Sequence, residues 1–327
     1  MTTAVLINLK ARRGSQRLAR TVRSHLPEAP LALTHSLADA HRFIAGLHDN
    51  QPDIVLSGGG DGTAVSLLNA WDRTRLPTLG LLPLGTGNGW ARSTHSPPFA
   101  QAIRQVARHR ARPWPVKRFS LVEVEGTLSP WAGTGWDAQV LADYHRVMGA
   151  LPAGAARYVG GFPGYMVSLF GLTVPKMAIA PRTQVRLINL GSDALGIDRA
   201  GKVVPVEGGG AGEVLFEGPV SVCGCGTIEE IGLGFRAFPF AHAAKGRMAA
   251  RVYGDTALRA ARNVRKLWRG EHPFAHDVHF MLDKCRMEFD RPVDFEIGGD
   301  IVGQRTSVDF SLAKEHASLL DWSRLAA

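Results

Sequence analysis

A chain of 327 residues is too long for one small core and long enough for two modest ones. Hydrophobic residues make up 45% of it and charged residues 20%, which fits an ordinary globular protein, and an odd count of three cysteines argues against a disulfide framework. The net charge of +9 favours an anionic partner, whether nucleic acid, an acidic membrane or a phosphorylated ligand, without choosing among them.

The first third of the chain alternates short apolar runs with amphipathic segments. We predict the runs as strands and the segments as helices. The strands are 4–9, 31–34, 53–57 and 78–82, and the helices are 15–25, 37–48 and 64–71. Because strands and helices alternate, we expect an α/β domain with a parallel sheet covered on both faces.

Beyond residue 118 the pattern changes to alternating apolar and polar residues, which is typical of half-buried strands. Such runs are 119–125, 184–189, 246–253 and 285–289, with glycine-rich turns at 207–212 and 232–234. They predict a C-terminal antiparallel β-sandwich. A stiff linker containing Pro113 and Pro115 marks the boundary. The predicted domains are therefore 1–115 and 116–327, and the last residues can pack back on the first domain.

Two further segments each have more than one interpretation. The longest apolar stretch, from Tyr158 to Pro181, is interrupted by glycines, prolines and Lys176, which argues against a transmembrane helix. It fits an interfacial or substrate-lining helix, or a buried one. The basic stretch from Arg259 to Arg269 fits a lipid-binding surface or a solvated helix face.

Histidine and cysteine residues predict no metal centre and no disulfide. His272, His276 and His279 have the spacing of metal ligands, but no second cluster supports them. The three cysteines, Cys223, Cys225 and Cys285, fit small buried thiols in a reducing cytoplasm.

Two glycine-rich segments each follow a predicted buried strand, the place where open α/β sheets bind ligands. The first reads Ser-Gly-Gly-Gly-Asp-Gly-Thr over 57–63, and the second Pro-Leu-Gly-Thr-Gly-Asn over 83–88. Their glycines leave backbone amides bare, so phosphates can approach closely, and the amino end of the following helix adds a partial positive charge. Asp61 would repel a phosphate unless it holds Mg²⁺, orients a donor or accepts a proton. Two such segments together indicate a phosphate site.

The two segments resemble the catalytic domain shared by bacterial diacylglycerol kinases, YegS-like lipid kinases and sphingosine kinases. The Gly-Gly-Asp-Gly-Thr element is also similar to one in NAD kinases, whereas Pro-Leu-Gly-Thr-x-Asn favours the lipid kinases. The resemblance extends along nearly the whole chain. Its other elements are Asn8, Thr34, Gly-Trp-Asp-Ala at 135–138, the apolar run around Gly164 and Tyr165, Phe-Pro-Phe-Ala at 238–241 and Gly-Gly-Asp at 298–300.

This resemblance implies an NAD kinase/diacylglycerol kinase-like fold and an ATP-dependent kinase acting on a lipid hydroxyl, with ATP and Mg²⁺ as cofactors. The implied nucleotide-binding residues are Asn8, Thr34, Gly59, Gly60, Asp61, Gly62, Thr63, Gly85, Thr86 and Asn88. It also implies that Asp61 lies near Mg²⁺ and the acceptor hydroxyl, that Asp300 is the candidate general base, and that Asp137 holds the lipid's polar head.

Several family carboxylates are absent, which puts the metal arrangement and the activity in question. The departures are Leu9 for Pro, Val65-Ser66 for Asn-Glu, Gly89 for Asp, Lys245 for Asp, Gly298 for Asp and Asp300 for Glu. The three aspartates also have structural interpretations. Asp61 fits a turn carboxylate that bonds backbone amides, Asp137 fits a helix N-cap, and Asp300 fits a hairpin turn.

The leading hypothesis is thus a cytoplasmic lipid kinase that meets an anionic membrane peripherally. A kinase of a soluble hydroxyl compound such as NAD is the nearest alternative, and the apolar stretch speaks against it. A catalytically weak nucleotide- or lipid-binding relative is the third. Nucleic-acid binding would explain the charge but neither glycine segment, so we expect no nucleic acid partner. The sequence does not identify the acceptor lipid.

Overall fold

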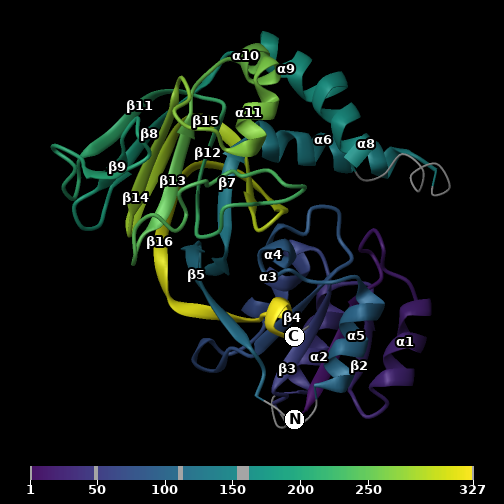
Figure 1. The fold of residues 1–327 in the computed structure, drawn as a ribbon. Helices are drawn as coiled ribbons and strands as arrows, with labels where there is room; N and C mark the ends of the chain where they lie inside the picture. Colours follow the sequence, from purple (N-terminus) through teal and green to yellow (C-terminus); the bar gives the residue numbers. More distant parts are fainter. Residues whose placement is uncertain (1, 48–50, 110–112, 153–161, 326–327) are drawn as a thin grey trace. The chain divides into compact units, whose positions relative to one another are not determined.

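A computed structural model describes residues 2–47, 51–109, 113–152 and 162–325 (Figure 1). The chain folds into two compact units. Unit 1 consists of Met1–Ser120 together with Glu315–Ala327, and unit 2 consists of Leu121–Lys314. The C-terminal residues therefore belong to the same unit as the N-terminal ones.

Unit 1 is built on a parallel sheet with the strand order β4-β3-β1-β2, and the end of β16 (Asp300–Leu320) pairs with β4 in parallel. Its strands are β1 (Thr3–Asn8), β2 (Leu31–Thr34), β3 (Ile54–Gly59) and β4 (Thr78–Pro83). Its helices are α1 (Arg17–His25), α2 (Leu37–Ala45), α3 (Asp61–Asn69), α4 (Gly89–Ser93), α5 (Phe99–Arg108), the short α12 (Trp322–Leu325) and a 3₁₀ turn at Arg73–Arg75. The parallel strands confirm the predicted α/β sheet.

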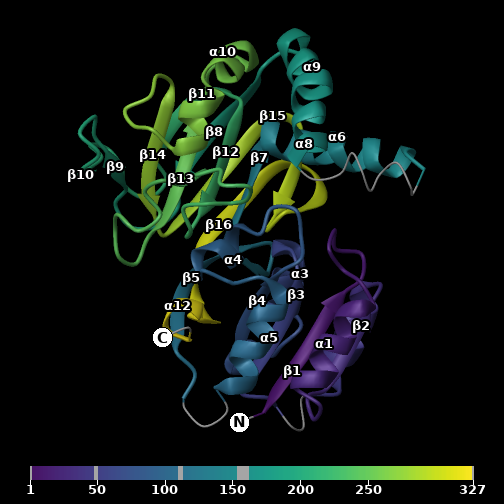
Figure 2. The same ribbon diagram turned by 45° about the vertical axis from the view of Figure 1, so that its right-hand side comes forward.

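Apolar residues on both faces of this sheet explain why helices cover it. In β1, Val5 and Ile7 belong to the core formed with α1 and α5, and the alternating residues Ala4 and Leu6 are equally buried. Helix α5 places Phe99, Ala102, Ile103 and Val106 in that core, which is the spacing of one helix face. The turned view in Figure 2 shows α1 and α5 alongside the strands.

Unit 2 is rich in antiparallel strands, as predicted. They are β5 (Val116–Val124), β6 (Thr127–Ser129), β7 (Trp131–Gly135), β8 (Thr183–Asn189), β9 (Leu195–Ile197), β10 (Val203–Pro205), β11 (Val214–Val220), β12 (Val222–Gly226), β13 (Met248–Tyr253), β14 (Asp277–Leu282), β15 (Lys284–Ile297) and β16 (Asp300–Leu320), of which β5 and β16 begin or end in unit 1. The first half of β15 pairs with β8, and its second half pairs with β7. Side chains of β7, β8 and β15 belong to one hydrophobic core. All three cysteines are buried there, as expected.

Helices of unit 2 are inserted between strands. They are α6 (Trp136–Ala150), α8 (Phe162–Ser168), a π-helical turn η2 (Leu169–Thr173), α9 (Val174–Ile179), α10 (Ala257–Arg262) and α11 (Val264–Arg269). Within the described residues, no helix is long and apolar enough to cross a membrane.

Candidate functional site

The two glycine segments lie at the carboxyl edge of the sheet of unit 1, as parallel strands require. Strand β3 ends at Gly59, and α3 begins two residues later with Gly60 at its N-cap. The sequence predicted that this helix starts at Ala64, but its first turn already includes Asp61, Gly62 and Thr63. The unbonded amides of a helix N-terminus therefore come from the glycine segment itself.

The two segments touch through their backbones. The N–H groups of Leu84 and Gly85 both donate to the carbonyl oxygen of Gly59, each at 3.0 Å. A Cβ atom on Gly85 would lie 2.4 Å from the Cα of Gly60, and one on Gly59 would lie 2.3 Å from Oγ1 of Thr63. No side chain fits at either place, so these glycines are required by the close approach.

Asp61 joins the segments a second time. Its buried carboxylate accepts the backbone N–H of Gly89 at 2.9 Å through Oδ2 and that of Trp90 at 3.0 Å through Oδ1. These are the first two residues of α4, so Asp61 caps that helix from α3. The bonding of backbone amides, which the sequence left open, is therefore present.

Asn88 is also used within its own segment. It adopts a left-handed conformation with φ of 53°, and its side-chain Oδ1 accepts from Gly85 N at 2.9 Å while Nδ2 donates to Gly85 O at 2.8 Å. The carboxamide thus closes the turn on both sides. Thr86 between them is half-buried.

The ends of β1 and β2 complete this edge. Asn8 donates from Nδ2 to Oγ1 of Thr63 at 3.0 Å, and its Oδ1 accepts the N–H of Lys10 at 2.9 Å. Thr34 is buried, and its carbonyl accepts the N–H of Leu9. With Asn8 donating to it, the Thr63 hydroxyl keeps its own hydrogen to donate to a ligand. All ten residues expected at a nucleotide site therefore lie along one edge of unit 1.

Asp137 and Asp300 belong to unit 2. Asp300 is an exposed residue directly after a two-residue hairpin, because Ile297 pairs with Asp300 and both Gly298 and Gly299 have positive φ. The turn interpretation of Gly-Gly-Asp is therefore right for the backbone. Asp137 is the second residue of α6, where Gly135 holds the N-cap position, and its side chain lies outside the described residues.

A third aspartate, which the sequence analysis did not single out, organises a cavity in unit 2. Asp143 of α6 is buried and accepts from Lys176 Nζ at 2.6 Å, Arg146 Nη1 at 3.0 Å and Thr173 Oγ1 at 3.0 Å. The cavity beside it measures about 290 Å³. Its other polar lining residues are Gln139, Arg182, Thr183, Ser221 and Asp294.

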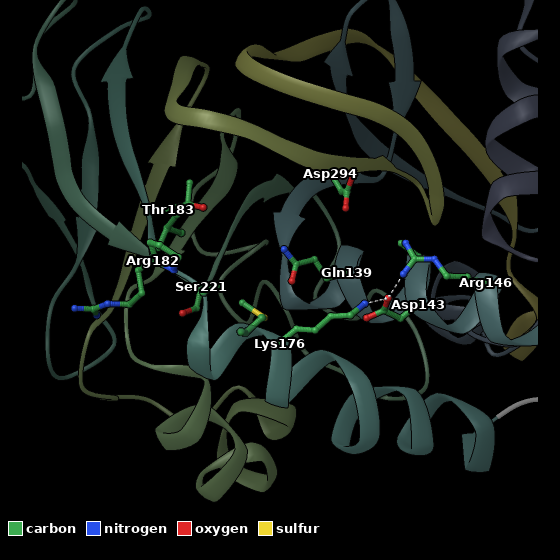
Figure 3. A pocket seen from close by; sticks show the side chains of 13 residues that line it. Gln139, Asp143, Arg146, Lys176, Arg182, Thr183, Ser221 and Asp294 are labelled. Carbon is green, nitrogen blue, oxygen red and sulfur yellow. Dashed lines mark hydrogen bonds and ion pairs between the residues drawn. The ribbon is translucent and has the colours of Figure 1, made fainter.

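Figure 3 shows Lys176 and Arg146 converging on Asp143 from different sides, while Arg182 extends away from them. The signal in the sequence was Lys176, the one charged residue between Phe162 and Pro181. A lone cation in such a stretch requires a partner if it turns inward.

Comparisons with known proteins agree with this geometry. Residues 2–119 match the model of the diacylglycerol kinase catalytic domain. Residues 2–119 belong to this family. The "Probable lipid kinase YegS-like" of Cronobacter sakazakii (strain ATCC BAA-894) is 34% identical over 105 residues, which are 31% of this chain and 34% of that protein. The protein with the same name from Enterobacter sp. (strain 638) is 35% identical over 78 residues, 23% of this chain and 26% of its own length. The matches thus span about a third or less of these relatives.

The fold extends beyond the diacylglycerol kinase catalytic domain itself. A crystal structure of a diacylglycerol kinase from Bacillus anthracis str. Sterne superposes with a TM-score of 0.62 at 16% identity, covering 98% of this chain and 96% of that one. The predicted fold class and the family resemblance are both confirmed.

The edge of the diacylglycerol kinase catalytic domain fits phosphates better than it fits a protein-built metal cage. The glycines leave a cradle that any Cβ would fill, whereas no cluster of three or more His, Cys, Asp or Glu side chains is placed to hold a metal among the described residues. Mg²⁺ usually binds through one or two carboxylates together with the phosphates. A metal here would therefore arrive with the nucleotide, close to Asp61.

Proposed function

We propose that the protein is an ATP-dependent lipid kinase that transfers the γ-phosphoryl group to a lipid hydroxyl. The observation that carries this proposal is the twofold contact between the glycine segments, once through their backbones and once through the Asp61 carboxylate, which fixes both segments beside the amino end of α3. Helix N-termini bind phosphate through their unbonded amides and their dipole. The names of the curated relatives support a lipid rather than a soluble acceptor.

In this proposal the residues of unit 1 bind and orient the nucleotide. The amides of Gly60, Gly62 and Thr63 contact its phosphates, and Asn8 orients the Thr63 hydroxyl toward them. Asp61 fixes the second segment through the amides of α4, and it is the carboxylate that would help to hold a Mg²⁺ bound together with ATP. Magnesium supplies neutralisation of the charge that develops on the transferred phosphate.

The acceptor end of the reaction requires a base and a head-group site. The lipid hydroxyl oxygen bonds to the γ-phosphorus, the bond to the β–γ bridging oxygen breaks, ADP leaves, and the hydroxyl proton passes to a carboxylate. We propose Asp300 as that carboxylate and Asp137 as a contact of the lipid's polar head. The cavity at Asp143, on the same helix as Asp137, is the candidate space for that head group.

One observation favours a second candidate, a binding relative with weak turnover. Both oxygens of Asp61 already accept backbone amides, and the family's acidic positions at Ser66, Gly89, Lys245 and Gly298 carry no carboxylate. Such a protein would bind ATP without passing phosphate to a lipid.

Transfer of labelled γ-phosphate from ATP–Mg²⁺ to a panel of lipids in mixed micelles tests the proposal, with ATP binding measured on the same samples. We expect a labelled lipid with the wild type and at least a hundredfold less with Asp300→Asn. The matched control is Asp309→Asn, an exposed aspartate of the same strand that pairs with Arg286. ATP binding without labelled lipid would select the binding relative, and a labelled water-soluble acceptor would replace the lipid kinase by a soluble-substrate kinase.

A further inference from the structure

One helical arm of unit 2 exposes an apolar face. The arm consists of α8, η2 and α9, and its exposed large apolar residues are Val167, Phe170, Leu172 and Ile179. Ile179 is 88% exposed and Val167 is 61% exposed. Apart from Lys176, the other exposed residues of the arm are Gly171, Pro175 and Ala178, none of which carries a polar side chain. The outer face of the arm is therefore apolar along its length.

The opposite face of the arm packs against the rest of unit 2. Ser168, Leu169 and Thr173 are buried, and Thr173 and Lys176 both bind Asp143 of α6. The exposed apolar residues therefore lie on a packed helical segment, and they are not exposed merely because they are at a chain terminus.

A basic segment adjoins the arm. Residues 257–269, which form α10 and α11, contain five cations and no acid, and all five are exposed: Arg259, Arg262, Arg265, Lys266 and Arg269. Arg259 approaches Asp255 at 3.6 Å and Arg269 approaches Glu271 at 3.8 Å. Over the described part of the chain, no ion pair involves Arg262, Arg265 or Lys266. Leu258, in the same segment, is 53% exposed.

Arm and basic segment are in direct contact. Phe170, Val174 and Met177 of the arm line a small apolar pocket together with Ala260, Ala261 and Val264 of α10 and α11. In Figures 1 and 2, α9 and α10 lie side by side in both views. We call the exposed residues of α8, η2, α9, α10 and α11 the arm surface.

The composition of the arm surface selects its occupant. A two-fold pairing with a second copy would bring together two surfaces of the same charge, because residues 257–269 contain no acid to pair with these cations. An anionic bilayer satisfies both halves of the surface, because apolar side chains enter the acyl boundary while lysine and arginine meet the head groups.

We propose that the arm surface docks the protein on anionic lipid bilayers, with Phe170 and Ile179 inserted and Arg262, Arg265 and Lys266 at the head groups. The inference deepens the proposed lipid kinase by naming the surface at which it reaches its acceptor. Docking is an equilibrium property of unit 2 and is measured without ATP or turnover. Failure to dock and failure to transfer phosphate are therefore separate results.

Vesicle flotation of the full chain tests the proposal, comparing phosphatidylcholine vesicles with vesicles containing 30% phosphatidylglycerol. Roughly this fraction of anionic lipid gives the vesicles a negative surface potential. We expect binding to the anionic vesicles, weakened by added salt. Because each cation near such a surface strengthens binding about fivefold, Arg262→Gln/Arg265→Gln/Lys266→Gln should reduce it by about a hundredfold. Phe170→Ser/Ile179→Ser should reduce it by about a hundredfold or more.

Two matched controls separate the surface from bulk properties. Arg17→Gln/Arg20→Gln/Arg23→Gln removes three exposed cations from α1 in unit 1, and Leu37→Ser removes an apolar residue that is 63% exposed in α2. Both should bind vesicles within about twofold of the wild type. Equal losses in test and control variants, or wild-type binding that ignores lipid charge, would overturn the proposal. A second result would also overturn it. If the wild type were a dimer, and Phe170→Ser/Ile179→Ser made it monomeric without changing vesicle binding, the arm surface would be a contact between copies.

Discussion

The carboxylate of Asp61 accepts the backbone N–H of Trp90 at 3.0 Å, across 29 residues of sequence. With the neighbouring bond from Gly89, this contact makes the first glycine segment the cap of the helix that follows the second. An aspartate expected beside a metal is thus also what fixes the relative position of the two segments.

Asp61→Asn should lower both stability and nucleotide binding. An asparagine keeps one acceptor oxygen but turns an N–H₂ group toward the other backbone amide, leaving a buried donor unsatisfied. We expect a loss of about 1–3 kcal/mol in the free energy of unfolding, measured in urea. Asp53→Asn is the control, because Asp53 also accepts a backbone amide, from Thr2 at 2.6 Å, but at an exposed site. A loss as large in the control would contradict a special role for the buried bonds.

Gly85→Ala should abolish nucleotide binding. The new Cβ would lie 2.4 Å from the Cα of Gly60, a backbone atom that cannot move without shifting the first turn of α3. Titration of the variant with ATP should show at least a hundredfold weaker affinity. Gly149→Ala in α6 is the matched control, since its Cβ meets nothing within 4 Å, and this helical substitution should be neutral or stabilising by up to about 1 kcal/mol. Unchanged ATP affinity in Gly85→Ala would show that the close contact between Gly85 and Gly60 is not needed for nucleotide binding.

Asn88 combines a left-handed backbone with two side-chain bonds, and two substitutions separate these. Asn88→Gly keeps the left-handed conformation and loses the bonds to Gly85, whereas Asn88→Ala loses the bonds and adds steric strain. The alanine variant should therefore be less stable than the glycine variant by about 1 kcal/mol in urea unfolding. If the two variants were equally stable, the left-handed conformation of residue 88 would make no contribution to the free energy of unfolding.

Much of unit 1 was predictable because its signals are local. Strand β2 was placed at 31–34 and occupies Leu31–Thr34, and both glycine segments were placed at strand ends. Buried parallel strands are short apolar runs, and glycines mark their ends. The start of α3 was missed by three residues, because Gly60 and Gly62 are poor helix formers and only the tertiary contacts of Asp61 and Thr63 favour the helical turn there.

The parts that sequence did not predict depend on distant partners. Asp143 is an ordinary helical aspartate until α9 brings Lys176 to it, 33 residues later in the chain. The run predicted at 285–289 is the start of β15, which continues to Ile297 through a register shift between Glu288 and Val293 and so pairs with two different strands. Neither the bulge nor the change of partner has a local signature, since both are set by the opposing strands.

A buried ion pair in unit 2 predicts how the protein responds to acid. Arg251 binds Asp277 through two bonds of 2.8 and 2.6 Å, and both side chains are almost wholly buried. Burial alone raises the pKa of Asp277, but the charge of Arg251 and the hydrogen bond from His279 outweigh it and lower the pKa from 3.8 to about 2. A depressed carboxylate pKa gives stability that is complete above pH about 4 and is lost as pH falls toward 2.

Asp277→Asn should therefore destabilise the protein by about 3–5 kcal/mol near pH 7, because Arg251 remains buried without its counter-charge. The difference between variant and wild type should shrink as pH falls from 4 to 3, measured as urea midpoints at each pH. Burial lowers the pKa of His279, so part of the wild-type stability is also lost as pH falls below about 6.5. Because Asp277 partly offsets that lowering of the His279 pKa, the variant changes this contribution too, and the comparison that reports on Asp277 is the one between pH 4 and 3. The control Asp309→Asn breaks an exposed pair with Arg286 and should cost less than about 1 kcal/mol. A pH-independent difference for Asp277→Asn would mean that packing, and not charge, accounts for its effect.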